Sequence, residues 1–181
     1  MTEEQFKAVY PQVYKWIRQT LFSHAAQART VDSVGFTRLA LYFTSELLST
    51  TKFVVVDRVP VPPLSAMGLK QFADFEKGDW GGMTYLDTFF VHQSRASDES
   101  LFVHELIHVL QWRLLGPERF LASYADGLET LGYHKSPLEV MAYDAENTFI
   151  TVTQPFDAEK LIKEQLKNRI ILGNKKGRII C

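Results

Sequence analysis

Residues 101–110 read LFVHELIHVL and form the middle of a longer apolar segment, residues 99–115. An aspartate precedes this segment and Gly-Pro follows it, and these residue types favour the start and the end of a helix. The segment therefore predicts one α-helix over residues 99–115. Within residues 101–110 the only polar side chains are those of His104, Glu105 and His108.

These three side chains form an HExxH motif, whose spacing has a chemical meaning on a helix. Residues four positions apart project from the same helix face, so His104 and His108 can bind one ion together. Imidazole nitrogen is a common ligand of Zn²⁺. Glu105 lies beside them and can take the proton of a metal-activated water as a general base. The motif predicts a zinc site with two histidine ligands and Glu105 as the catalytic residue.

A catalytic zinc site of this kind needs a third protein ligand. Gln111 and Leu114 stand where a metzincin would continue with glycine and histidine, so that class is excluded. We expect a carboxylate downstream, and Glu139 is the first choice because it lies in the first turn of a predicted helix. Ser136 and Glu139 also match a capping box, which needs no metal. The alternatives that the residues leave open are Glu129 and Glu146.

Composition limits the class of protein. The chain has 181 residues with 46% hydrophobic residues, which suits one domain over residues 1–181. With 20 Lys and Arg against 21 Asp and Glu, the charge does not favour nucleic acid as a partner. A single cysteine excludes a disulfide framework and a Cys-rich zinc finger. No signal peptide or membrane-spanning segment is predicted, so we expect a cytoplasmic protein without a membrane partner.

Periodicity and turn residues predict an α+β chain with two helices, a strand, a helix, a strand and four further helices. The expected helices cover residues 3–27 with an interruption at Pro11, 32–48, 64–76, 99–115, 117 to at least 126, 137–148 and 157–172. The expected strands cover residues 52–59 and 83–91, and residues 173–181 are expected to form a loose tail. The basic stretch from Lys160 to Arg178 is interpreted as a solvated helix and tail.

Two longer runs resemble a known family. LFVHELIHVLQWRLLGPERF (101–120) and GYHKSPLEVMAYDAE (132–146) are similar to small gluzincin-type zincin metallopeptidases. More narrowly, they resemble uncharacterised small bacterial proteins with the pattern HELxHVxQW, LGP, GY and PLExxAY. VPVPPL (59–64) and GMTYLDTFFV (82–91) also fit, so that the resemblance covers roughly residues 35–150.

The resemblance implies a zincin-like fold, mainly helical, with a small β-sheet above the HExxH helix. An edge strand of that sheet would bind an extended peptide, and residues 83–91 would form that strand or its neighbour. The resemblance also implies Glu139 as the third ligand. In thermolysin-like members an acid four residues after this glutamate supports a zinc histidine. Here that position is Tyr143, and Asp144 is a candidate substitute in the second shell.

The sequence therefore predicts a zinc metallopeptidase that hydrolyses a peptide or protein substrate, and it indicates no particular oligomeric state. Tyr143 and His134 are candidate donors to the oxyanion, or pocket residues, because both lie near Glu139 in the sequence. Gln111 is a candidate pocket or second-shell residue. The alternative is a catalytically inactive module of zincin fold that binds a metal or a peptide.

Overall fold

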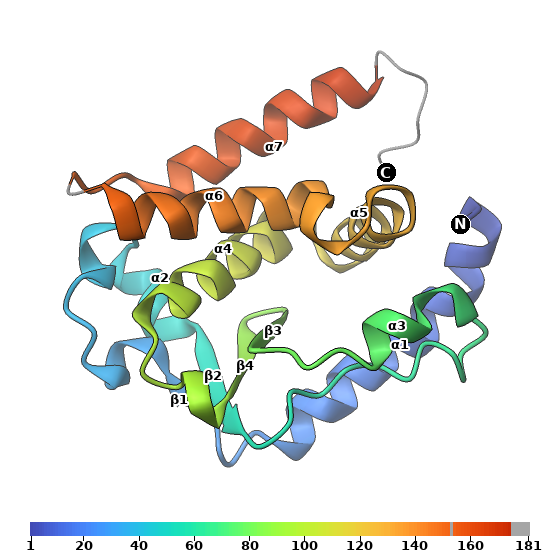
Figure 1. The fold of residues 1–181 in the computed structure, drawn as a ribbon, viewed down its shortest axis with the longest axis horizontal. Coiled ribbons are helices and arrows are strands. Elements are labelled where there is room, and N and C mark those ends of the chain that lie inside the picture. The colour runs from blue at the N-terminus through green and yellow to red at the C-terminus, as the bar shows by residue number, and fades with distance from the viewer. Residues whose placement is uncertain (153, 175–181) are drawn as a thin grey trace.

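Seven α-helices and four short strands make up the described part of the chain, which covers residues 1–152 and 154–174, with side chains up to residue 168, in a computed structural model (Figure 1). The fold is mixed α+β, as predicted. The helices are α1 (Glu3–Ser23), α2 (Ser45–Thr50), α3 (Ala73–Glu76), α4 (Glu99–Leu115), α5 (Pro117–Leu131), α6 (Pro137–Thr151) and α7 (Ala158–Asn174). The strands are β1 (Arg29–Thr30), β2 (Lys52–Val56), β3 (Gly82–Tyr85) and β4 (Thr88–His92).

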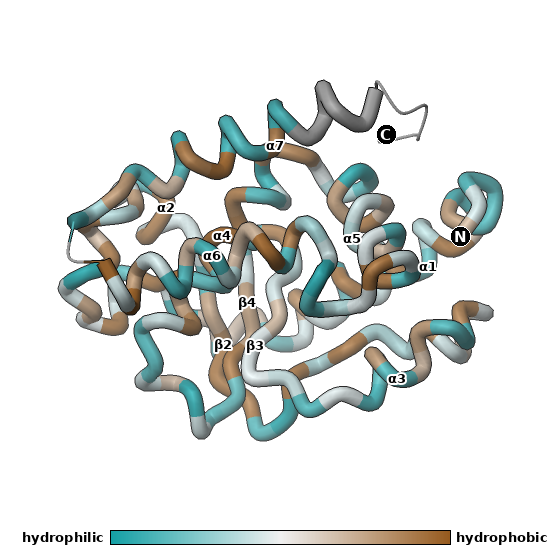
Figure 2. Tube along the Cα trace, turned by 45° about the horizontal axis from the view of Figure 1, so that its top comes forward, coloured by the Kyte–Doolittle hydropathy of each residue, from teal (hydrophilic) through white to brown (hydrophobic). Residues whose placement is uncertain are grey.

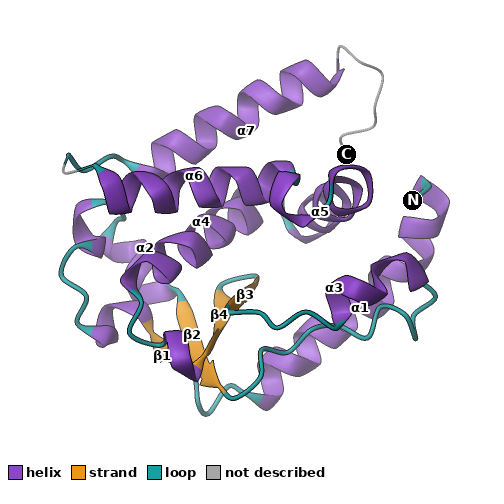
Figure 3. Ribbon diagram, viewed as in Figure 1, coloured by secondary structure: helices purple, strands orange, loops and turns teal. Residues whose placement is uncertain are grey.

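The strands form one sheet in the order β1-β2-β4-β3. β2 and β4 are parallel, whereas the two outer pairs are antiparallel. Figure 3 shows the sheet below α4 and α6, with α1 and α3 to its right in the same view. β3 is an edge strand, and it lies close to α4.

Aromatic side chains join the sheet to the helices. On one face, Phe53 of β2 and Phe89 of β4 both pack against Phe102 of α4, with ring centroids 5.1 Å apart in each pair. On the other face, Tyr85 of β3 packs against Trp16 of α1. Since side chains alternate along a strand, the two faces of this small sheet are covered by different helices.

Helix α4 is the centre of the fold. Every residue from Leu101 to Trp112 is buried, including the polar ones. A helix that is apolar on nearly all sides can only be stable when other elements surround it. α4 contacts α5, α6, α7 and the strands β3 and β4, and Figure 2 shows hydrophobic segments gathered where α4 meets the strands.

The predicted bounds of α4 are confirmed. The Asp98 side chain accepts hydrogen bonds from the backbone N–H groups of Ser100 and Leu101, at 3.1 and 3.3 Å. At the other end, Gly116 has a φ of 76°, a conformation that glycine adopts without strain. The helices predicted after Pro117, Pro137 and Asp157 are also present as α5, α6 and α7.

Three predictions in the first half of the chain are wrong. Residues 32–48 form two 3₁₀ turns and the short helix α2, because Gly35 takes a left-handed φ of 85° and ends the first turn. Gly68, with a φ of 93°, likewise separates turns from the short helical segment at 70–76, so that no continuous helix covers residues 64–76. Residues 83–91 form a hairpin and not a single strand, since the chain reverses at Leu86, which has a φ of 58°.

Smaller differences concern element ends. α1 continues through Pro11 as one helix and ends at Ser23, and the strand expected to reach residue 59 ends at Val56. Most of the predicted tail, residues 175–181, lies outside the described residues. Among the described helices, none has the length and apolar character needed to cross a membrane.

The cap of α4 gives a first prediction. Asp98→Ala removes the acceptor for two helix N–H groups and should lower the free energy of unfolding by about 1–2 kcal/mol. Urea unfolding followed by circular dichroism measures the change. Asp98→Asn is the matched control, because its side-chain oxygen can still cap the helix. An equal loss in both variants would show that the cap hydrogen bonds are not what Asp98 contributes.

Candidate metal centre

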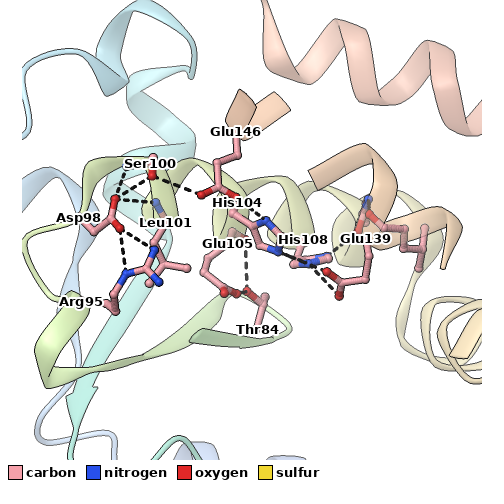
Figure 4. A network of polar contacts seen from close by, with 12 residues as sticks. Thr84, Arg95, Asp98, Ser100, Leu101, His104, Glu105, His108, Glu139 and Glu146 are labelled. Carbon is pink, nitrogen blue, oxygen red and sulfur yellow. Dashed lines mark hydrogen bonds and ion pairs between the residues drawn. The ribbon is translucent and has the colours of Figure 1, made fainter. Parts of the chain in front are cut away.

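Three buried side chains converge between α4 and α6. His104 and His108 project from one face of α4, and Glu139 faces them from the first turn of α6 (Figure 4). The two imidazole Nε2 atoms are 3.2 Å apart. Glu139 places Oε2 at 3.4 Å from His104 Nε2 and Oε1 at 3.3 Å from His108 Nε2. These residues form a group that could hold a metal ion, with ligand atoms within 4.8 Å of one another.

The geometry of this group fits a cation. Glu139 is 1% exposed, and its Oε2 atom has no hydrogen-bond partner among the described residues. In a tetrahedral site with metal–nitrogen bonds of 2.0–2.1 Å, neighbouring ligand atoms lie about 3.3 Å apart. The 3.2 Å between the two Nε2 atoms is close to this spacing, and with one oxygen of Glu139 all three ligand atoms lie within 4.8 Å of one another. Two imidazoles and one carboxylate also leave a fourth position open, as in catalytic sites.

Hydrogen bonds orient both imidazole rings. His104 donates through Nδ1 to Glu146 Oε2 at 3.1 Å, and His108 donates through Nδ1 to Gln111 Oε1 at 2.8 Å. Gln111 in turn donates to the Leu138 carbonyl at 2.9 Å. With hydrogen on both Nδ1 atoms, the two Nε2 atoms carry lone pairs that face each other. This arrangement fixes the tautomer that a metal ligand requires.

The charges around His104 also favour a cation within this group. Burial lowers the pKa of His104, but the close contacts with the carboxylates of Glu139 and Glu146 outweigh it and raise the pKa from 6.5 to about 10. For Glu139, burial raises the pKa, yet the two histidines hold it well below its usual range. The group therefore favours a positive charge between its members, whether that charge is a proton or a metal ion.

Glu105 lies on the side of α4 that faces β3. Thr84 of β3 donates its hydroxyl to Glu105 Oε2 at 2.6 Å. Burial raises the pKa of Glu105, while the nearby His104 and His108 and the Thr84 hydrogen bond oppose the rise without cancelling it. Gly82 leaves room for this carboxylate, because a Cβ there would clash with Glu105 Oε1.

Tyr124 of α5 is a contact that the sequence did not predict. Its hydroxyl donates to Glu139 Oε1 at 2.7 Å, so the carboxylate is held from a third helix. The ring of Tyr124 also stacks on Phe120, 5.7 Å away. The spacing of four residues between Phe120 and Tyr124 could have indicated that both rings share one face of α5. Thr84 was expected only as part of a strand near the cleft, not as the partner of Glu105.

The remaining candidates are divided between the site and the surface. The ring of Tyr143 packs against His104 at 4.6 Å, and Tyr133 packs near Tyr143 at 6.5 Å. Burial, followed by the charge of Glu139, raises the pKa of Tyr133 far above its usual range. His134 is exposed, although its ring lies 5.8 Å from that of Tyr143.

Two acidic candidates do not reach the group. Asp144 is exposed, and Glu146 occupies the position beside His104 that Asp144 was suggested to fill. Glu129 is exposed and pairs with the amino group of Met1. The structure thus brings Glu139, rather than Glu129, to the two histidines, and gives Glu146 a supporting position.

The candidate metal-binding group, His104, His108 and Glu139, borders a cavity. Glu105, His108 and Glu139 are among its lining residues, together with Thr84 and Tyr133. Nearly all other lining side chains are apolar, and they come from α1, residues 62–75, β3, α4 and α5. The polar group is therefore accessible from an apolar space.

Comparisons with protein-family models, with curated proteins and with solved structures find no match to this chain. The chemistry of the group is accordingly inferred from its own donor atoms, separations and burial.

The contact at Gly82 gives a second prediction. Gly82→Ala should displace the Glu105 carboxylate and lower the free energy of unfolding by about 1–3 kcal/mol, because the added methyl group has no room. Gly81→Ala is the matched control, since a Cβ there meets nothing closer than Arg95 at 3.5 Å. Urea unfolding of the pair measures the difference. Equal stability of the two variants would contradict the close approach of Glu105.

Metal binding gives a third prediction. The purified protein should bind one divalent ion per chain, and His104→Ala and Glu139→Gln should abolish stoichiometric binding. Glu146→Gln and Gln111→Leu should weaken it about 10–100-fold, since they only orient the ligands. Metal analysis after dialysis, with titration of the weaker variants, measures these effects. Glu129→Gln is the control, and loss of metal in that variant alone would refute the assignment of Glu139.

Proposed function

We propose that this chain is a zinc-dependent metallopeptidase of gluzincin type, with a zincin-like fold, that hydrolyses amide bonds in peptide or protein substrates. One observation carries the proposal: a buried group of two imidazoles and one carboxylate has both Nε2 atoms turned inward, with a second carboxylate beside it. A purely structural zinc site is typically closed by four protein ligands. Here three ligands converge beside a cavity, which favours a catalytic site.

The donor set supports zinc among the divalent ions. Imidazole nitrogen suits zinc, copper, iron and nickel, whereas magnesium and calcium favour sites built of oxygen alone. The 3.2 Å between the two Nε2 atoms is close to the spacing of neighbouring ligands around a tetrahedral zinc ion. A divalent ion held by His104, His108 and Glu139 would act as a Lewis acid and lower the pKa of water.

The residues of this chain supply the proton transfers. Glu105 takes a proton from the attacking water and later delivers it to the leaving amine. Thr84 holds the Glu105 carboxylate through a hydrogen bond of 2.6 Å. Burial raises the pKa of Glu105 toward the range in which a carboxylate works as a general base. Tyr143 and Tyr133 are the candidate donors to the developing oxyanion, and the buried setting strengthens such a bond.

The role of Glu105 gives a fourth prediction. Glu105→Gln should retain one metal ion per chain and lower hydrolysis of a peptide library by about 10²–10⁴-fold or more, because the amide cannot accept the proton. Cleavage is measured by mass spectrometry, and metal content is measured in the same samples.

Two results would decide against this function. Undiminished cleavage by Glu105→Gln would refute the mechanism. Stoichiometric metal without cleavage by the wild-type protein would instead favour a binding module of the same fold. Glu118→Gln, at a glutamate in the first turn of α5 that does not line the cavity, is the control for a loss of carboxylate charge.

A further inference from the structure

Apolar side chains line the cavity beside His108 and Glu139 over more than one helical turn of both α1 and α5. On α5 its lining extends from Phe120 to Leu128, which is about 12 Å along the helix axis. On α1 the lining extends from Phe6 to Ile17, or about 16 Å. Two or more helical turns of apolar wall are longer than any apolar amino-acid side chain. The cavity therefore suits a long apolar group rather than one residue of a peptide.

The polarity of the wall limits what can enter. No Lys, Arg or Asp side chain of the described residues lines the cavity, and the lining carboxylates there are those of Glu105 and Glu139. Met1 also lines the cavity, but its amino group is already paired with Glu129. A charged group among the apolar side chains would lose its hydration without a partner, which is costly. The apolar part of the cavity consequently suits an uncharged ligand.

Most of the hydrogen-bond donors along the wall, other than the hydroxyls of Tyr10 and Tyr133, are already used. The hydroxyls of Tyr85 and Tyr124 bond to the Pro60 carbonyl and to Glu139, and the Trp112 indole bonds to the Thr84 carbonyl. A peptide main chain entering the cavity would bury N–H and C=O groups without partners. An aliphatic chain has no such groups and needs only apolar contact.

From these observations we infer that the cavity binds an aliphatic acyl chain, with the carbonyl end of that chain at His108 and Glu139. This inference rests on the proposed function for its reaction, and it names the substrate class as N-acyl amides. Water adds to the acyl carbonyl and the C–N bond breaks, giving a carboxylic acid and an amine. The tail of the chain lies between α1 and α5, and the amine part lies outside the apolar space.

Binding can be tested separately from hydrolysis. The probes are N-acyl glycinamides with butanoyl, octanoyl and dodecanoyl chains, titrated calorimetrically into the protein as purified and into protein treated with a chelator. Affinity should rise by about fourfold per added methylene group, up to the length of the cavity. This rise should persist without metal, because the apolar wall produces it. Equal affinity for all three probes, or tighter binding of a blocked tetraleucine peptide, would overturn the inference.

A variant pair locates the chain. Ala125 lies on the cavity side of α5, whereas Ala122 on the same helix does not line the cavity. Ala125→Phe should weaken dodecanoyl binding at least tenfold and leave butanoyl binding unchanged, since it fills space that only the longer chain needs. Ala122→Phe should change neither. Equal effects of the two variants on the dodecanoyl probe would place the chain elsewhere. The chain-length series in the wild-type protein remains decisive if Ala125→Phe does not fold.

The two proposals fail in different ways. Chain-length-dependent binding, with cleavage of neither the dodecanoyl probe nor the peptide library, would retain the acyl site and remove the metallopeptidase. Hydrolysis of unacylated peptides without any chain-length dependence would retain the metallopeptidase and remove the acyl site.

Discussion

Four polar side chains on the buried helix α4 must be satisfied, and the rest of the structure depends on this constraint. His104, Glu105, His108 and Gln111 are all at most 5% exposed. A buried polar group without a partner costs several times more than a hydrogen bond gains. Thr84 on β3 bonds to Glu105, and Glu139 and Glu146 on α6 contact His104. Tyr124 on α5 in turn holds Glu139. The helices and the hairpin are thus held in register by polar contacts as well as by apolar packing.

Charge balance shows how a cation would stabilise this network. Glu139 and Glu146 contact His104, and Glu105 lies on the adjacent side of α4. With neutral imidazoles, these three carboxylates carry a formal charge of −3 in a largely dry setting. A divalent ion would reduce it to −1, whereas a single proton would reduce it only to −2. The orphaned Oε2 atom of Glu139 marks the position where such an ion would be held.

The sequence predicted what local rules determine. The bounds of α4 follow from capping residues, and the shared face of His104 and His108 follows from the helical period. The choice between Glu139 and Glu129 depends on how α4, α5 and α6 pack, which periodicity does not contain. Glu146, and not Asp144, contacts His104. Glu146 lies seven residues, or two helical turns, after Glu139 and so shares its helix face, whereas Asp144 lies five residues after Glu139 and does not. The failed helix over residues 32–48 reflects a left-handed glycine that apolar periodicity cannot reveal.

The polar group gains its chemical character from the apolar cavity next to it. Electrostatic attraction is stronger where water is excluded, so the same walls that would receive an aliphatic chain also strengthen the contacts at His104 and Glu139. Burial destabilises the charged form of Glu105 and therefore raises the pKa of this carboxyl group. The Thr84 hydroxyl limits the rise in this pKa by stabilising the charged carboxylate. Gly82 leaves the space that the Glu105 carboxylate occupies. A side chain at position 82 would move Glu105 away from β3, and the base would then lose both its orientation and its only hydroxyl partner among the described residues.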